Sequence, residues 1–246
     1  MEIIAHRGAS YDAPENTLAA VNLAWAQGAD AVEIDVHLSR DGRVAVIHDD
    51  NTRKTSGFNA KVCNQLWADL RKLDVGGWKG SKWKGEYIPE LEEVLATVPS
   101  GKRLFIEVKC REQFIDAAAQ SLQGKSGKQL VIIGFSLETM KRLKSKFSDL
   151  EVCWIVEFKR RLPGRRWSPT PARVIEQARA AGLDGLDVGA NGPLTRQFVQ
   201  NAKAAGLGVY VWTVDSAAKA RRLRDAGVDG ITTNKPGWMR QQLQRP

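Results

Sequence analysis

The chain has 246 residues, which suits one large domain, and it is 43% hydrophobic and 26% charged, as in ordinary globular proteins. It contains no apolar run long enough for a membrane span and no signal-peptide pattern, so we expect a cytoplasmic protein without stable membrane insertion. Three widely spaced cysteines, Cys63, Cys110 and Cys153, form neither a disulfide framework nor a zinc spacing. The net charge of +9 comes without a nucleic-acid-binding module, so we interpret it as solubility and attraction for anionic small molecules.

The first 37 residues indicate a strand, a helix and a second strand. An apolar run at 3–5 ends at His6-Arg7, and Pro14-Glu15-Asn16-Thr17 carries the acidic and capping residues of a helix start. The helix is expected to end at Gly28. In 31–37, β-branched and polar residues alternate, which predicts a strand with Glu33, Asp35 and His37 on one face. This order is typical of a parallel α/β unit.

The next strand, 44–49, follows the turn signal Asp41-Gly42 too closely for a helix to intervene. The two strands should therefore form an antiparallel hairpin. With the turn centred between Asp41 and Gly42, residue 48 pairs opposite residue 35. This register places His48 beside Asp35.

Residues 50–88 lack clear periodicity and are rich in Gly, Lys and Trp towards their end. We expect an insertion with a short helix near 64–70, lying within a single domain that spans 1–246. Because it projects from the loop that carries His48, it is expected to shape substrate choice.

Regular alternation returns after Pro89. We expect helices over 90–98, 112–123, 137–147, 170–181, 194–205 and 216–226, and from about 236. Strands are expected over 103–109, 130–135, 151–157, 183–188, 208–214 and 230–233. Apart from the hairpin return, this makes eight strands, each followed by a helix, which predicts a TIM (β/α)8 barrel with a small insertion after strand two.

In such a barrel the active site lies at the carboxyl ends of the strands. Glu33, Asp35 and Glu107 converge there and form an all-oxygen ligand set that suits a divalent cation, Mg²⁺ or Ca²⁺ rather than Zn²⁺. The cation would also relieve the repulsion between neighbouring carboxylates.

Two histidines and two cations flank this acidic site. His6 and His48 suit general acid and general base catalysis near neutral pH. Arg7 and Lys109 add positive charge that can bind a phosphate, although Lys109 could equally pair with Glu107 alone. Together these groups indicate phosphoryl chemistry.

The sequence resembles the glycerophosphodiester phosphodiesterases, bacterial cytoplasmic type. The matching stretches are His6-Arg7-Gly8-Ala9, Pro14-Glu15-Asn16-Thr17, Glu33-Ile34-Asp35-Val36, Asp41-Gly42, His48-Asp49, Ile88-Pro89-Glu90-Leu91-Glu92-Glu93-Val94-Leu95, Glu107-Val108-Lys109, Val211-Trp212-Thr213-Val214 and Gly227-Val228-Asp229-Gly230-Ile231. They cover nearly the whole chain in family order.

The resemblance implies a TIM barrel with an inserted subdomain and a divalent metal. It also implies hydrolysis of a small-molecule glycerophosphodiester to glycerol 3-phosphate and an alcohol, within glycerol and lipid metabolism. The position of Trp212 at a strand end then favours a pocket wall that packs on the glycerol. The chain departs from the family at Asn234, where an aspartate is common, and a role for an acid of the eighth strand is thereby in doubt.

Two other functions are compatible with the pattern. One is a phospholipase D-like lyase acting on lysolipids, and the other is a catalytically inactive barrel that binds phosphate or membrane. The intact set of two histidines and three carboxylates argues against the inactive barrel.

Several further residues have open roles. His37 is expected to be a hydrogen-bonding neighbour of the site rather than a ligand, and Glu157 and Asn234 are weaker site candidates. Trp78 and Trp83 either pack the insertion on the barrel or line the substrate entrance. The basic loop 159–166 is either solvated or a guide for anionic substrates. The alcohol moiety, the nucleophile and the oligomeric state are not predicted.

Overall fold

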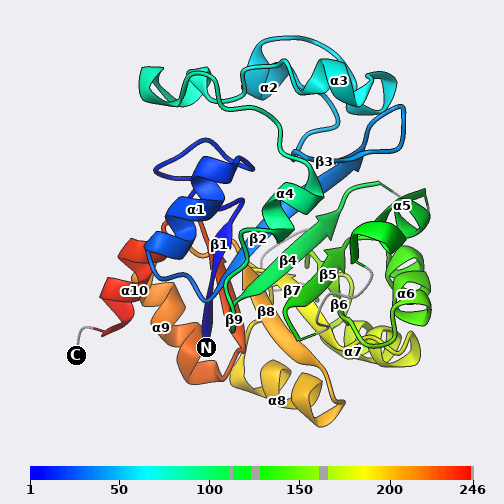
Figure 1. The fold of residues 1–246 in the computed structure, drawn as a ribbon. Coiled ribbons are helices and arrows are strands. Elements are labelled where there is room, and N and C mark those ends of the chain that lie inside the picture. Colours follow the sequence, from blue (N-terminus) through cyan, green and yellow to red (C-terminus); the bar gives the residue numbers. More distant parts are fainter. Residues whose placement is uncertain (111–112, 123–127, 161–165, 245–246) are drawn as a thin grey trace.

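The computed structural model describes residues 1–110, 113–122, 128–160 and 166–244, and its centre is a closed barrel of eight parallel strands (Figure 1). Pairing of the first strand with both the second and the last closes the barrel. The predicted TIM barrel is confirmed. Its strands are β1 (Glu2–His6), β2 (Ala31–Leu38), β4 (Arg103–Val108), β5 (Leu130–Gly134), β6 (Glu151–Val156), β7 (Gly185–Gly189), β8 (Gly208–Trp212) and β9 (Gly230–Thr233).

The predicted hairpin is present, but its register differs by one residue from the prediction. β3 (Val44–Val46) runs antiparallel to β2, with Val36 opposite Val46. The Ile47 N–H donates to the Asp35 carbonyl oxygen at 2.9 Å, so Ile47, not His48, lies opposite Asp35. The cause is the connection, which comprises five residues, 39–43, and is centred on Asp41. His48 therefore lies one residue beyond the position expected for it.

The helices begin where Ser or Thr side chains accept hydrogen bonds from the first-turn N–H groups. Thr17, Ser136, Thr170, Thr195 and Ser216 each form such a cap. The helices that follow the barrel strands are α1 (Leu18–Ala26), α5 (Gln113–Leu122), α6 (Leu137–Lys146), α7 (Pro171–Ala180), α8 (Arg196–Ala204), α9 (Ala217–Ala226) and α10 (Pro236–Gln244), with α4 (Leu91–Leu95) leading into β4.

One helix starts later than the sequence indicated. The prediction was a start at Pro14, whereas α1 begins at Leu18. Asn16 has a φ of 59°, in the left-handed region, and therefore cannot continue a helix. Asn16 instead has a role at the candidate site.

Two apolar layers hold the barrel together. The larger one fills the space between the strands and the surrounding helices. The smaller one lies inside the barrel and contains Ile4, Phe105, Ile133 and Ile155, among others. Below this inner layer, at the amino end of the strands, the Arg103 guanidinium contacts Glu2, Glu151 and Tyr210.

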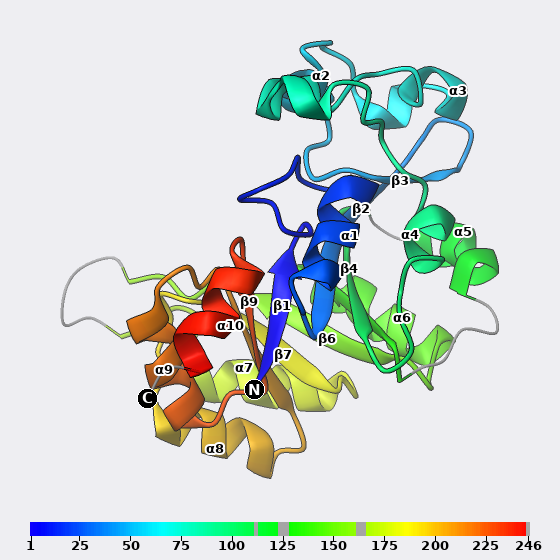
Figure 2. The same cartoon turned by 60° about the vertical axis from the view of Figure 1, so that its left-hand side comes forward.

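The insertion stands at the carboxyl end of the strands, over the barrel mouth (Figure 1, Figure 2). It consists of α2 (Arg53–Ser56), η1 (Val62–Asn64), α3 (Trp67–Leu70), η2 (Gly77–Lys79) and η3 (Ser81–Trp83). The helix expected near 64–70 is thus two shorter pieces. Val62, Leu70 and Val75 pack with Ile47 and Ile88 in a small apolar core of their own. The Lys79 ammonium donates to the Ser10 carbonyl oxygen at 2.6 Å and ties the insertion to the loop after β1.

Arg103 provides a test of the amino end of the barrel. Arg103→Met leaves the carboxylates of Glu2 and Glu151 without their guanidinium partner in a partly buried setting. We expect the free energy of unfolding to fall by about 2 kcal/mol, less than for a fully buried pair. Urea denaturation measures this. Lys72→Met, which removes the largely exposed pair with Asp69, is the matched control and should change stability by less than about 1 kcal/mol. Equal losses would contradict the structural role of Arg103.

Candidate active site

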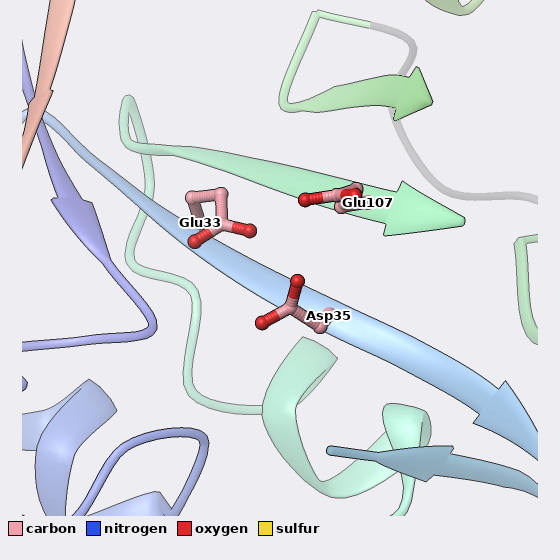
Figure 3. A group of neighbouring side chains, drawn as sticks. All are labelled: Glu33, Asp35 and Glu107. Carbon is pink, nitrogen blue, oxygen red and sulfur yellow. The ribbon is translucent and has the colours of Figure 1, made fainter. Parts of the chain in front are cut away.

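The register of the barrel strands gathers three carboxylates at the mouth. Asp35 on β2 pairs directly with Glu107 on β4, and Glu33 on β2 pairs with His6 on β1. Paired residues of parallel strands point to the same side, so all of them face the barrel interior. One oxygen from each of Glu33, Asp35 and Glu107 lies within 4.8 Å of the others (Figure 3). This spacing allows one cation to contact all three acids.

These carboxylates keep oxygen atoms that no hydrogen bond from a described residue satisfies. They are Oε1 of Glu33, Oδ1 of Asp35 and Oε1 of Glu107, all buried. The Lys109 ammonium approaches the latter two at 3.1 and 2.6 Å, within ion-pair distance. The donor set is entirely oxygen and anionic, which fits a hard divalent cation such as Mg²⁺ or Ca²⁺. The three carboxylates predicted as metal ligands therefore suit a divalent cation.

The surroundings push the three carboxyl pKa values apart. Burial, with Asp35 and Glu107 beside it, raises the pKa of Glu33 well above its usual range. Burial and Asp35 raise the pKa of Glu107 to about 7. Burial also opposes ionisation of Asp35, but Lys109 and Arg7 outweigh it and lower its pKa to about 2. Without a bound cation, Asp35 therefore ionises first as the pH rises, and Glu33 and Glu107 keep their protons to higher pH.

The loop after β1 binds the same carboxylates. The Arg7 N–H donates to Glu33 Oε2 at 2.9 Å, and the Arg7 guanidinium lies 3.2 Å from Asp35 Oδ2 and 2.9 Å from Glu15. Asn16 donates to Asp35 Oδ2 at 2.8 Å and accepts from the Asp35 N–H at 3.1 Å. The loop therefore fixes the orientation of Asp35 through Arg7 and Asn16.

His6 is held by a chain of hydrogen bonds behind it. Its Nδ1 donates to Asn234 Oδ1 at 2.7 Å, and the Asn234 amide donates in turn to Asp215 at 2.5 Å. With Nδ1–H engaged, Nε2 carries the lone pair. Burial, reinforced by Arg7, lowers the pKa of His6. A neutral imidazole with a basic Nε2 is the form that a general base requires. Asn234, a weaker candidate from the sequence, thus orients His6 through a hydrogen bond. Asp215 in turn accepts a hydrogen bond from Asn234.

His48 has a different setting. Its Nδ1 lies 2.5 Å from Asp49 Oδ1, which fixes the orientation of the ring. The His37 Nε2 donates to the His48 carbonyl oxygen at 3.0 Å, as expected of a hydrogen-bonding neighbour. Despite the one-residue difference in register, His48 lines the same cavity as Glu33 and Glu107.

The cavity at the barrel mouth has a volume of about 110 Å³, and most of the predicted site residues line it. His6, Arg7, Glu33, His48, Glu107, Lys109 and Trp212 line it, while Asp35 lies beneath, fully buried. Its apolar lining residues include Ile133, Ile155 and Phe135, whose ring meets that of Trp212 edge to face at 5.8 Å. Trp212 therefore forms part of the cavity wall, and its contact with the glycerol stays a prediction.

Other candidates lie apart from the residues that line this cavity. Glu157 is exposed and pairs with Lys159 at 3.2 Å. Trp78 and Trp83 lie in η2 and η3 of the insertion. Within the basic loop, residues 161–165 lie outside the described residues, and the Arg160 guanidinium stacks 4.0 Å from the centre of the Trp167 ring.

The glycerophosphoryl diester phosphodiesterase family model matches residues 6–238 of this chain. The chain belongs to the glycerophosphoryl diester phosphodiesterase family. The predicted enzyme class, a glycerophosphodiester phosphodiesterase, is confirmed.

Relatives of this family resemble the chain over most of their length. A glycerophosphodiester phosphodiesterase of Bacillus subtilis (strain 168) is 32% identical, with 95% of this chain and 83% of the relative aligned. One of Caldanaerobacter subterraneus subsp. tengcongensis is 29% identical, with 95% and 94% aligned. The solved structure of an Oleispira antarctica phosphodiesterase in complex with the product sn-glycerol-3-phosphate is 28% identical and has a TM-score of 0.88, over 100% of this chain and 97% of that one.

The structure also brings to the site residues that the sequence reasoning missed. Asn16 was interpreted only as part of a helix start. Asp187 on β7 was not considered, although a lone acid within the apolar run Gly185–Gly189 was a visible signal. It is 3% exposed, lines the cavity, and burial, with Glu107, raises its pKa well above the usual range. Within the described residues, no helix of this phosphodiesterase is long and apolar enough to cross a membrane.

The raised pKa of Glu107 predicts how stability depends on pH in the absence of divalent cations. Unfolded, this carboxyl ionises near 4.5, whereas folded it does so near 7. Between these values the folded protein holds more protons than the unfolded chain, so the free energy of unfolding falls as pH rises through this window. Asp35 is ionised throughout it.

Glu107→Gln should reduce this fall by about 2 kcal/mol, because the amide does not titrate. Urea denaturation in EDTA at pH 4.5 and 8 measures the difference, with the exposed Glu138→Gln as control. Parallel pH profiles for wild type and Glu107→Gln would contradict the assignment.

Proposed function

We propose that the protein hydrolyses glycerophosphodiesters to glycerol 3-phosphate and an alcohol with the help of a divalent cation, Mg²⁺ or Ca²⁺. The observation that carries this proposal is a cluster of three converging carboxylates, two of which line one cavity together with two histidines and two basic side chains. Glu33, Asp35 and Glu107 would hold the cation, which would supply Lewis-acid stabilisation of charge on the phosphate. The product-bound Oleispira antarctica relative supports the substrate class.

Arg7 and Lys109 would bind the phosphate of the substrate. Both already contact Asp35, at 3.2 and 3.1 Å, so they are held at the edge of the acidic cluster. The guanidinium offers a fork of donors, and the ammonium is a point charge that burial keeps close to the reacting group. Trp212 would pack against the carbon chain of the glycerol.

His6 and His48 would act as the acid–base pair. We assign His6 as general base, because its Nδ1–H is engaged with Asn234 and its Nε2 is free to accept a proton. We assign His48 as general acid, because Asp49 orients its ring and it lies near the insertion, on the side where the alcohol would leave. The base would activate water or the 2-hydroxyl of the substrate.

The direct test is release of glycerol 3-phosphate from glycerophosphocholine, with and without EDTA. Loss of release in EDTA and recovery with Mg²⁺ or Ca²⁺ is the expected result. A cyclic phosphate as the final product would instead favour the lyase.

The three free cysteines accord with a reducing compartment such as the cytoplasm.

Replacement of each acid in turn tests the metal site. Glu33→Ala, Asp35→Ala and Glu107→Ala should each lower activity by more than about 100-fold and weaken cation binding, since each removes an anionic oxygen ligand. Titration calorimetry with Mg²⁺ and Ca²⁺ measures the affinity, and Glu157→Ala is a control outside the cavity. Unchanged affinity in all three variants would remove the cation from this position.

The two histidine roles can be separated with a good leaving group. His6→Ala and His48→Ala should each retain cation binding and lose about 10²–10⁴-fold in turnover. Nitrophenolate departs without a proton, so the variant without the general acid, His48→Ala, should recover much of its rate on a nitrophenyl ester of glycerol phosphate. His6→Ala should stay slow. Recovery in His6→Ala alone would exchange the two roles.

A further inference from the structure

Two buried polar atoms on the wall opposite the acidic cluster have no hydrogen-bond partner among the described residues. They are Oδ1 of Asp187, on β7, and Nε1 of Trp212, on β8. Both side chains line the same cavity. A buried polar group without a partner is costly, so a ligand that supplies the missing bonds gains affinity from both.

The strand register places these two residues on one face of neighbouring strands. Asp187 pairs with Tyr210, and Trp212 pairs with Gly189, two residues further along each strand. Residues two apart on a strand point to the same side, so Asp187 and Trp212 both face inward, with Trp212 nearer the mouth. They form a short polar strip on a wall that is otherwise apolar.

Asp187 is not one of the cation-binding acids. No described basic side chain forms an ion pair with it, and it does not belong to the group of three oxygens within 4.8 Å of one another. Arg7 and Lys109, the phosphate-binding residues of the proposed function, both contact Asp35 on the other side of the cavity. The Asp187 wall therefore faces a different part of the substrate from the phosphate.

The chemistry of the two atoms decides what that part is. The carboxyl oxygen accepts a hydrogen bond, whereas the indole N–H only donates. An ammonium group would satisfy Asp187 but could offer nothing to Trp212. The anionic part of the substrate is its phosphate, which the proposed function assigns to Arg7 and Lys109. A hydroxyl group donates and accepts, so a single hydroxyl can satisfy both atoms.

We propose that Asp187 and Trp212 form a subsite that binds the terminal free hydroxyl of the glycerol moiety and selects for it. This inference rests on the proposed function, since it names a specificity element of the same substrate. It orients the diester with its glycerol end inside the barrel, between the apolar side chains of Ile133 and Ile155. The alcohol then points outward, towards His48 and the insertion.

The test compares two substrates that differ only in this hydroxyl, glycerol 3-phosphocholine and the phosphocholine diester of propane-1,2-diol at its primary carbon. The wild-type protein should favour the glycerol diester in kcat/KM by on the order of 10²-fold or more, because a site built to bond a hydroxyl rejects the analogue without it. Asp187→Leu and Trp212→Phe should bring the ratio towards one. Trp212→Phe keeps the aromatic ring and removes the N–H, so it tests the subsite even if Asp187→Leu does not fold.

Asp187→Asn and Asp184→Asn are the matched variants. The first keeps a side-chain acceptor and should retain much of the preference. The second removes a carboxylate at the amino side of β7, where Asp184 pairs with Lys144 at 2.8 Å, and should leave the ratio unchanged. An unaltered ratio in both Asp187→Leu and Trp212→Phe, or a wild-type ratio near one, would overturn the inference.

A separate binding measurement distinguishes failure of the subsite from failure of the proposed function. Calorimetry with glycerol 3-phosphate and propane-1,2-diol 1-phosphate, each with Mg²⁺, should show the same preference and the same loss in Asp187→Leu. If the wild-type protein hydrolysed neither diester but bound glycerol 3-phosphate selectively through Asp187, the subsite would stand and the proposed hydrolysis would fall. Equal binding of the two phosphates would overturn the subsite.

Discussion

The pairing of Asp35 with Glu107 on neighbouring parallel strands is the constraint on which the rest of the site depends. It places two carboxylates side by side inside a barrel, with a third two residues away, where water cannot screen their repulsion. Two basic side chains offset this repulsion. Arg7 contacts Asp35 from the loop after β1, and Lys109 contacts it from the end of β4. Asn16 adds two hydrogen bonds to Asp35, so this carboxyl ionises at a lower pH than its two neighbours. The negative charge of the three carboxylates is in this way concentrated at the barrel mouth, where a metal cation can bind to it.

The two ends of the barrel interior differ for the same reason. At the amino end, Arg103 is surrounded by Glu2, Glu151 and Tyr210, and its charge is matched within the protein. At the carboxyl end, several buried polar atoms have no hydrogen-bond partner in the part of the chain that the structure describes. Buried polar groups thus have their partners at the amino end and lack hydrogen bonds at the carboxyl end. This difference indicates that a ligand binds at the carboxyl end. The barrel is therefore stabilised at the end remote from its chemistry.

Much of the fold and of the candidate site was predictable from the sequence. The alternation of strands and helices indicates the barrel, and the period of two along 31–37 places Glu33 and Asp35 on one inward face. Features that depend on contacts between distant residues were harder. The hairpin register depends on the length of the loop 39–43, and a shift of one residue moved His48 past the position opposite Asp35. In the sequence, Asn16 belongs to a segment that resembles a helix start. Its left-handed backbone is explained by its hydrogen bonds to Asp35, 19 residues away in the chain. Asp187 was overlooked because a single acid on a strand has no local pattern to reveal its surroundings.

The hydrogen bond between His6 and Asn234 joins residues that are 228 positions apart in the chain. His6 belongs to the first strand, and Asn234 directly follows the last one, so the bond crosses the seam where the barrel closes. A ribosome delivers His6 first and Asn234 almost at the end of synthesis. The carboxylates of β2 and β4 are therefore all present in the nascent chain well before the partner of the His6 imidazole is made. In the proposed function His6 is the general base, so a chain without its last strand would lack the partner that holds this base.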